Sequence, residues 1–287
     1  MSNLTIPIRG NKLSMNVEVR GHLFTRQSEF QRIDIVDTLC FGRMLLLDNH
    51  IQLAELDEHA YHESLVHIPM LSLNQPKRAL VVGGGDGGVV REILRHNSIR
   101  HVDMVEIDRA VIDACTDFLP FLNGGAFDDT RLKIHVADAF EFVKGGLESY
   151  DLIVMDSTDV YEEEDGGLSE QLWTGEFYSA IHSLLSPEGI VVTQADNPVF
   201  CRYSLDSILA TYRQAFAAAG SYWGLVPSFG GYSAFVWGSK GREVSFDWPG
   251  SLPAMGQGMP HEFGYLNAGT LAMAEGEVPF RGEFESC

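Results

Sequence analysis

The sequence has 287 residues, enough for one large domain or two modest ones. Hydrophobic residues make up 45% and charged residues 21%, a composition that excludes a disordered or fibrous chain. Because 40 acidic residues outnumber 20 basic ones, the formal net charge is −20, which disfavours nucleic acid and anionic membranes as partners. Such a charge favours cationic small molecules, although it also serves simply to keep a protein soluble.

The cysteines give no sign of a disulfide framework or a zinc site. Cys40, Cys115, Cys201 and Cys287 are scattered, without a Cys-x-x-Cys pair or a cluster with histidine. The N-terminus lacks the apolar core of a signal peptide, and no apolar run reaches about 18 residues. We therefore expect a soluble cytoplasmic protein with reduced thiols and no metal.

The first part of the chain predicts short strands. Residues 30–37 alternate around β-branched side chains, and residues 43–48 form a second strand that enters a turn. Helical spacing of apolar residues then runs over 55–71. We predict an N-terminal β-strand domain over residues 1–65.

From residue 78 the pattern alternates between apolar strands and helices. We expect strands at 79–82, 101–105, 131–136, 150–155 and 189–193, separated by helices at 89–96, 109–118 and 177–185. A helix over 205–219 and closing strands at 223–226 and 233–237 follow. Apolar strands separated by helices indicate a parallel sheet covered on both faces, so residues 66–287 are predicted to form a nucleotide-binding α/β domain.

A glycine-rich turn, Gly83-Gly-Gly-Asp-Gly-Gly88, lies between the first of these strands and its helix. Its glycines allow close approach of a ligand to the backbone, and Glu106 ends the next strand at the offset of an acid that bonds ribose hydroxyls. Together they indicate adenosine binding; the alternative is a tight turn beside a solvated acid. Asp138-Ala139, just past the third strand, fits an adenine contact or a helix N-cap equally well.

Asp86 lies inside this turn, where a carboxylate would repel a pyrophosphate or the carboxylate of S-adenosylmethionine. The same carboxylate would attract an ammonium group. A sulfonium nucleoside that has lost its methionine carboxylate therefore suits the turn best, the alternative being that Asp86 caps the following helix.

Several motifs in combination resemble the polyamine aminopropyltransferases, the family of spermidine synthase. They are Leu47-Asp-Asn-His-Ile-Gln52, Asp57-Glu-His-Ala-Tyr-His-Glu63, the Gly83–Gly88 turn, Glu106-Ile-Asp108, Asp156-Ser-Thr-Asp159 and Val192-Thr-Gln194. The resemblance implies a small N-terminal β-domain followed by a methyltransferase-like, Rossmann-type seven-stranded sheet with helices on both faces. It also implies a homodimer or homotetramer, a polyamine acceptor, and decarboxylated S-adenosylmethionine as co-substrate, without a cofactor.

The resemblance also assigns roles to individual residues. Expected contacts to the donor nucleoside are Gln31, Gly84, Asp86, Glu106, Asp138 and Ala139. Expected contacts to the acceptor amine are Gln52, Tyr61, His62, Asp86, Asp159 and Gln194. Asp156 resembles the proton acceptor, which the chemistry requires because an alkylammonium with a pKa near 10.4 has no lone pair for attack. An Asp-x-x-Asp after a strand is otherwise a turn and a cap.

The chain departs from the family pattern at two places that concern the acceptor. Residues 160–167 are acidic and lack the proline that many relatives carry, and Val226-Pro-Ser-Phe-Gly-Gly231 is more similar to thermospermine synthases. Putrescine is the first expectation, with agmatine or spermidine as alternatives. More distant alternatives are a methyltransferase that uses intact S-adenosylmethionine and a non-catalytic nucleoside-binding paralogue.

Overall fold

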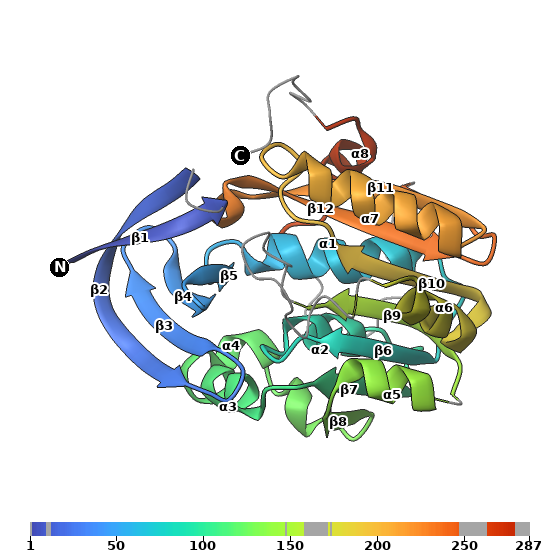
Figure 1. Cartoon of the computed structure of the whole chain (residues 1–287), viewed down its shortest axis with the longest axis horizontal. Helices are drawn as coiled ribbons and strands as arrows, with labels where there is room; N and C mark the ends of the chain where they lie inside the picture. The colour runs from blue at the N-terminus through green and yellow to red at the C-terminus, as the bar shows by residue number, and fades with distance from the viewer. Residues whose placement is uncertain are drawn as a thin grey trace.

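The chain forms two β-sheets that lie side by side (Figure 1). Residues of both sheets line a cavity between them. The computed structural model describes residues 2–9, 13–146, 148–157, 172, 174–246 and 263–278. The N-terminal sheet has five strands and the second sheet has seven. This arrangement confirms the predicted fold class of a small β-domain followed by a Rossmann-like α/β sheet.

The N-terminal sheet is an antiparallel meander in the order β1-β2-β3-β4-β5. Its strands are β1 Ser2–Arg9, β2 Leu13–Gln27, β3 Arg32–Thr38, β4 Gly42–Leu47 and β5 His50–Ala54. Both faces are apolar: Val36 and Met44 pack on one side, while Ile33, Ile35 and Leu45 pack on the other. Sequence reasoning missed β1, because Pro7 interrupts its short alternation and proline in a sheet is confined to edge strands such as this one.

The larger sheet has the order β11-β12-β10-β9-β6-β7-β8. Its strands are β6 Arg78–Gly83, β7 His101–Glu106, β8 Leu132–Val136, β9 Tyr150–Asp156, β10 Leu185–Gln194, β11 Ala218–Val226 and β12 Gly231–Ser239. The five strands from β10 to β8 are parallel, and β12 and β11 add antiparallel pairs at one edge. Strand order reverses beside β6, which neighbours both β7 and β9, and α/β sheets bind ligands at such a point.

Helices cover both faces of this sheet (Figure 1). The helices are α1 Glu58–Leu71, α2 Gly88–Leu94, α3 Arg109–Phe118, α4 Pro120–Asn123, α5 Ala139–Gly145, α6 Gly175–Leu184, α7 Arg202–Ala215 and α8 Ala268–Glu275, with 3-10 turns η1 Ala126–Asp128 and η3 Pro227–Phe229. Residues of α1, α2 and α8 share one apolar core with the sheet, and residues of α5, α6 and α7 share the other. Across the described ranges, every helix is too short or too polar to span a bilayer.

Helix α1 joins the two sheets and belongs by its packing to the larger one. Ala60, Leu65 and Val66 lie in the same core as α2 and the larger sheet. The predicted domain boundary at residue 65 falls inside α1. The N-terminal sheet instead packs on α3, where Ala110 and Val111 meet its inner face. Both sheets are therefore tied to the helices that surround the cavity.

The segment 263–278 closes over α1 through one buried carboxylate. Glu63, which is fully buried, accepts backbone N–H groups of Gly264, Tyr265 and Leu266 at 2.7, 2.9 and 2.8 Å. The indole of Trp223 donates to the Gly276 carbonyl at 2.8 Å and holds the other end of this segment. Hydrogen bonds to a charged acceptor are the strong kind, so Glu63 is a principal anchor of α8.

We predict that Glu63→Gln lowers the free energy of unfolding by about 2–3 kcal/mol, because an amide presents only one acceptor atom to three buried N–H donors. Urea denaturation measures the loss, and limited proteolysis should show faster cleavage around residues 263–278. Glu275→Gln, at an exposed position of α8, is the control and should change neither result. Wild-type stability of Glu63→Gln would contradict the anchoring role.

Candidate active site

A cavity of about 420 Å³ lies between the N-terminal sheet and the strand ends of the larger sheet. It brings together ten of the twelve residues that the sequence predicted for the site: Gln31, Gln52, Tyr61, Gly84, Asp86, Glu106, Asp138, Ala139, Asp156 and Gln194. His62 lies behind this wall, and Asp159 lies outside the described residues together with the rest of 158–171. The roles of all twelve stay predictions at this point.

The parallel strands position these side chains, because their carboxyl ends all meet at one edge. Gly83 ends β6, Glu106 ends β7, Asp156 ends β9 and Gln194 ends β10. Asp138 follows β8 by two residues. Each parallel strand thus delivers one group to the cavity, as expected of a doubly wound sheet.

The glycine-rich turn is folded tightly against the end of β9. Gly83 has φ +82°, and a Cβ there would lie 2.2 Å from the Asp156 carbonyl oxygen. The N–H of Gly84 donates to that same carbonyl at 3.1 Å. Only glycine permits this approach, which places the backbone of the turn and the carboxylate of Asp156 at the same edge of the cavity.

One wall of the cavity suits a nucleoside. Burial raises the pKa of Glu106 to about 7, although an N–H bond from Asp108 at 2.8 Å opposes the shift. A ligand hydroxyl that donates a hydrogen bond to Glu106 would stabilise its ionised form. Gln31 reaches the same region from the other sheet and donates to Asp108 at 3.2 Å. Both sheets therefore contribute to this wall.

Asp138 caps a helix and also lies at the cavity, so its cap does not exclude the adenine contact that the sequence offered as the alternative. Its Oδ1 accepts the N–H of Phe140 at 2.8 Å and caps α5. The residue also lines the cavity, beside Ala139. A cap uses one carboxylate oxygen, so the second remains for a ligand.

Asp156 has the features of a general base. Its Oδ1 accepts the Tyr61 hydroxyl at 2.6 Å. Burial first, and then the nearby charge of Asp86, raise the pKa of Asp156 to about 6, while His62 and the Tyr61 hydrogen bond oppose the shift. A carboxylate with a raised pKa is a stronger base than an ordinary one and is still ionised at neutral pH.

The pKa of Asp86 is shifted in the opposite direction. Asp86 accepts the N–H of Gly88, the first residue of α2, at 2.6 Å, although the N-cap position itself is Gly87, and it lies 3.4 Å from the ring of His62. Burial alone would raise the pKa of Asp86, but the charge and hydrogen bond of His62 lower it below its ordinary value. Asp86 is therefore an ionised group that faces the cavity.

His62, Asp86 and Asp156 place one ligand atom each within 4.8 Å of one another. Burial opposes the charged form of His62, but Asp86 and Glu58 outweigh it and raise the pKa of His62 to about 10, so the group combines one imidazolium with two carboxylates. The chemistry of the group favours an ammonium ion between the carboxylates.

Sequence reasoning missed Asp196 and Asn197 of the cavity wall, whereas it had already connected the turn that carries Phe229, residues 226–231, with the acceptor. The available sequence signal was the position of Asp196, two residues after Gln194. In the structure Asp196 has a φ of +61°, which is unusual outside glycine. Phe229 packs edge-on against Tyr61 with ring centroids 5.6 Å apart. The turn that carries Phe229 is fixed by Asp57, which accepts the N–H and the hydroxyl of Ser228 at 2.7 and 2.8 Å.

Comparison with known proteins identifies the family. Residues 58–247 match the model of the spermine/spermidine synthase domain, and residues 6–55 match that of the spermidine synthase tetramerisation domain. The chain belongs to the polyamine aminopropyltransferase family. It is 37% identical over 236 residues to the polyamine aminopropyltransferase of Pyrobaculum calidifontis, covering 81% of this chain and 80% of the relative. The enzyme from Bacillus mycoides is 39% identical over 227 residues, covering 79% and 80%.

Solved structures agree with this assignment. A spermidine synthase in complex with the transition-state analogue AdoDATO superposes with a TM-score of 0.86 at 29% identity, covering 97% of this chain and 93% of that one. Spermidine synthase from Thermotoga maritima gives 0.86 at 27% identity, covering 97% and 92%. The protein is thus an aminopropyltransferase, as its sequence motifs predicted.

For this aminopropyltransferase we predict that Tyr61→Phe raises the pKa of Asp156 by about one pH unit, because a hydrogen bond to the ionised form is lost. Below its pKa the acid is protonated and cannot accept a proton, so the acidic limb of the kcat/KM profile should move to higher pH. Tyr222→Phe is the control, since that hydroxyl donates at 2.9 Å to the Ser64 carbonyl instead. An unmoved limb in Tyr61→Phe would contradict the assignment.

Proposed function

We propose that the enzyme transfers the aminopropyl group of decarboxylated S-adenosylmethionine to putrescine, forming spermidine and releasing 5′-methylthioadenosine. The observation that carries this proposal is the placement of two half-buried carboxylates, Asp86 on the glycine-rich turn and Asp156 at the adjacent end of β9. One is ionised and suits a donor ammonium, and the other is a base for the acceptor. The AdoDATO complex of a related spermidine synthase supports a donor of this kind.

The donor is proposed to lie along the strand ends. Glu106 would accept its ribose hydroxyls, with Gln31, Gly84, Asp138 and Ala139 around the nucleoside. Asp86 would hold the ammonium of the aminopropyl arm by a charge-assisted hydrogen bond. A donor that kept its carboxylate would place a negative charge beside Asp86, which argues against a methyltransferase reaction.

Asp156 is proposed to make the acceptor nucleophilic. It would take one proton from the bound alkylammonium, which frees the nitrogen lone pair to attack the aminopropyl carbon beside sulfur. A C–N bond forms as the C–S bond breaks, and sulfur leaves as a neutral thioether. The cationic sulfonium is already an activated leaving group, so the residues need only orient the two substrates about 3–3.5 Å apart.

The far end of the cavity is proposed to hold the second amine of the acceptor. Gln52, Gln194 and Asp196 line it with oxygen acceptors. Asp159 and His62, which the resemblance also assigns to amine binding, belong to this proposal as predictions. Phe229 bounds the same region, and a bulky ring there favours a short acceptor over spermidine.

The N-terminal match supports a homo-oligomer, either a dimer or a tetramer. We also propose that the enzyme acts without a cofactor in the cytoplasm. A homo-oligomer would leave the chemistry within one chain, because both sheets around the cavity come from the same chain.

We predict that Asp156→Asn lowers kcat by about 10²–10⁴, because the amide cannot accept the ammonium proton. Methylthioadenosine affinity, measured by calorimetry, should change little. The folded-state pKa of Asp156 lies above its ordinary value, so its carboxylate destabilises the fold at pH values above about 6. The variant should therefore be more stable than wild type by about 1–3 kcal/mol at pH 8, and the gain should shrink as the pH falls toward 4. Near wild-type turnover would show that another group is the base.

A separate prediction concerns the acceptor. Wild type should give a higher kcat/KM with putrescine than with agmatine or spermidine, measured side by side. Phe229→Ala should enlarge the cavity and shift the spermidine-to-putrescine ratio upward about tenfold, the scale of discrimination by one pocket side chain. Leu225→Ala, at an exposed position of β11, should leave the ratio unchanged. If wild type prefers spermidine or agmatine, the proposal that putrescine is the acceptor is wrong, while the proposed aminopropyl transfer still holds.

A further inference from the structure

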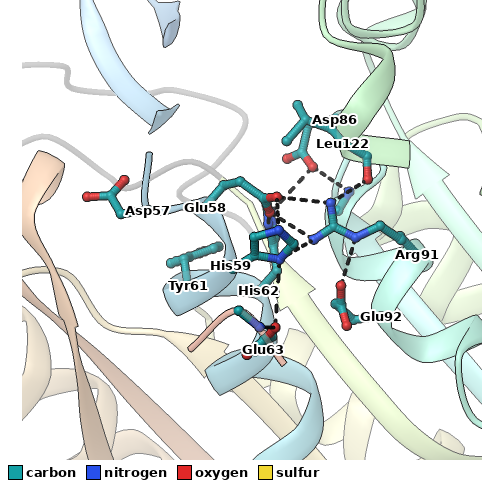
Figure 2. Close-up of polar contacts among 12 residues, drawn as sticks. Asp57, Glu58, His59, Tyr61, His62, Glu63, Asp86, Arg91, Glu92 and Leu122 are labelled. Atoms are coloured by element: carbon teal, nitrogen blue, oxygen red, sulfur yellow. Dashed lines mark hydrogen bonds and ion pairs between the residues drawn. The ribbon is translucent and has the colours of Figure 1, made fainter. Parts of the chain in front are cut away.

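A buried network of charged side chains lies directly behind Asp86, on the side away from the cavity. Figure 2 shows Glu58 and His62 of α1 converging with Arg91 of α2 on the loop that carries Asp86. Glu58 and His62 are almost fully buried, and Arg91 is 15% exposed. A buried charge without a partner is costly, so each of these side chains must keep its contact to the next one.

Arg91 fixes Glu58 in one orientation. Its two terminal nitrogens donate to the two carboxylate oxygens of Glu58 at 3.0 and 2.8 Å. The same guanidinium donates to the Leu122 carbonyl at 2.9 Å and, through Nε, to Glu92 at 2.7 Å (Figure 2). Because Leu122 and Glu92 hold the guanidinium in place, its bidentate pair with Glu58 leaves the Glu58 carboxylate little freedom to rotate.

Glu58 in turn fixes His62. Its Oε2 lies 2.6 Å from Nδ1 of His62, one helical turn along α1, and the opposite ring nitrogen, Nε2, lies 3.4 Å from Oδ1 of Asp86. Gly88 forms the floor under this ring, because a Cβ at that position would lie 2.3–2.5 Å from three ring atoms. The ring is therefore held between two carboxylates with no room to move.

We infer that Arg91 and Glu58 are positioning residues, which hold His62 as an imidazolium against Asp86 so that Asp86 stays ionised and correctly placed for the substrate amine. The inference rests on the amine-binding role proposed above for Asp86. It gives His62 a different task from the direct amine contact implied by family resemblance, since His62 does not line the cavity.

The electrostatics agree with this geometry. His62 faces Glu58 and Tyr61 on its own helix, Asp86 on the glycine-rich turn and Asp156 on β9. Burial favours its neutral form, but Asp86 and Glu58 outweigh burial and raise its pKa to about 10. Glu58 itself has its pKa lowered to about 2 by His62 and Arg91, against the effect of burial. Without the negative charge of Glu58, the protonated form of His62 would be less stable.

The decisive experiment is nitrogen NMR of histidine-labelled enzyme over a range of pH. In wild type both ring nitrogens of His62 should remain protonated at pH 8. In Glu58→Gln the pKa of His62 should fall, because one of its two carboxylate partners is gone. Above the new pKa the imidazolium fraction falls tenfold per pH unit, so kcat/KM for the donor, whose ammonium Asp86 is proposed to hold, should begin to fall at a lower pH than in wild type.

Two companion variants separate this role from a general loss of stability. Glu58→Asp keeps the charge and should restore most of the wild-type His62 pKa. Glu63→Gln removes another buried carboxylate from the same helix and should lower stability without moving the His62 pKa or the shape of the pH profile. The NMR titration needs no turnover, so it tests the network even if the proposed acceptor is wrong.

Three results would overturn the inference. A neutral His62 in wild type at pH 8 would do so without any variant. An unchanged His62 pKa in Glu58→Gln would show that Glu58 does not hold the charge. Equal shifts in Glu58→Gln and Glu63→Gln would assign the effect to the stability of α1.

Discussion

Two like charges in one buried crevice are the constraint on which the rest of the site depends. Asp86 and Asp156 lie so close that their ionisation is mutually unfavourable, and burial adds to the cost. The structure resolves this conflict by giving the two carboxylates different partners. Asp86 receives an imidazolium and a backbone N–H, whereas Asp156 receives the hydroxyl of Tyr61. Their pKa values are thereby driven apart, which is how a pair of acids acquires separate roles.

Helix α1 supplies both partners from consecutive positions. Neighbouring residues on a helix point about 100° apart, so Tyr61 can face Asp156 while His62 faces Asp86 on a different side. Both contacts form only if α1 has the correct rotation about its own axis and the correct distance from the strand ends. Its anchoring reflects this need, because Glu58 is fixed to α2 at one end and Glu63 binds residues 264–266 one turn later. The segment 263–278 thus supports the site without touching the cavity.

Much of this architecture was predictable from local patterns. The β/α alternation predicted the parallel strands, and a parallel sheet places residues at its strand ends together, as with Glu106, Asp138 and Asp156. The network behind Asp86 was not predictable in that way. Glu58 and Arg91 are 33 positions apart, and a charged residue on a helix usually faces solvent. The turn of Phe229 was expected to concern the acceptor, but the packing of this ring beside Tyr61 was not predictable, since it depends on a contact between residues 168 positions apart.

Asp57 shows how a local rule gives way at a functional site. Aspartate at the N-cap of a helix ordinarily accepts an N–H of the first turn, yet the Asp57 side chain makes no such bond to α1. Both of its oxygens bind Ser228 instead, and burial raises its pKa above the ordinary value. The helix gives up a capping bond, and the turn that carries Phe229 becomes fixed to the start of α1. Phe229, at the proposed acceptor end, and the residues proposed to keep Asp86 ionised are therefore positioned by the same first turn, so α1 cannot move without changing both.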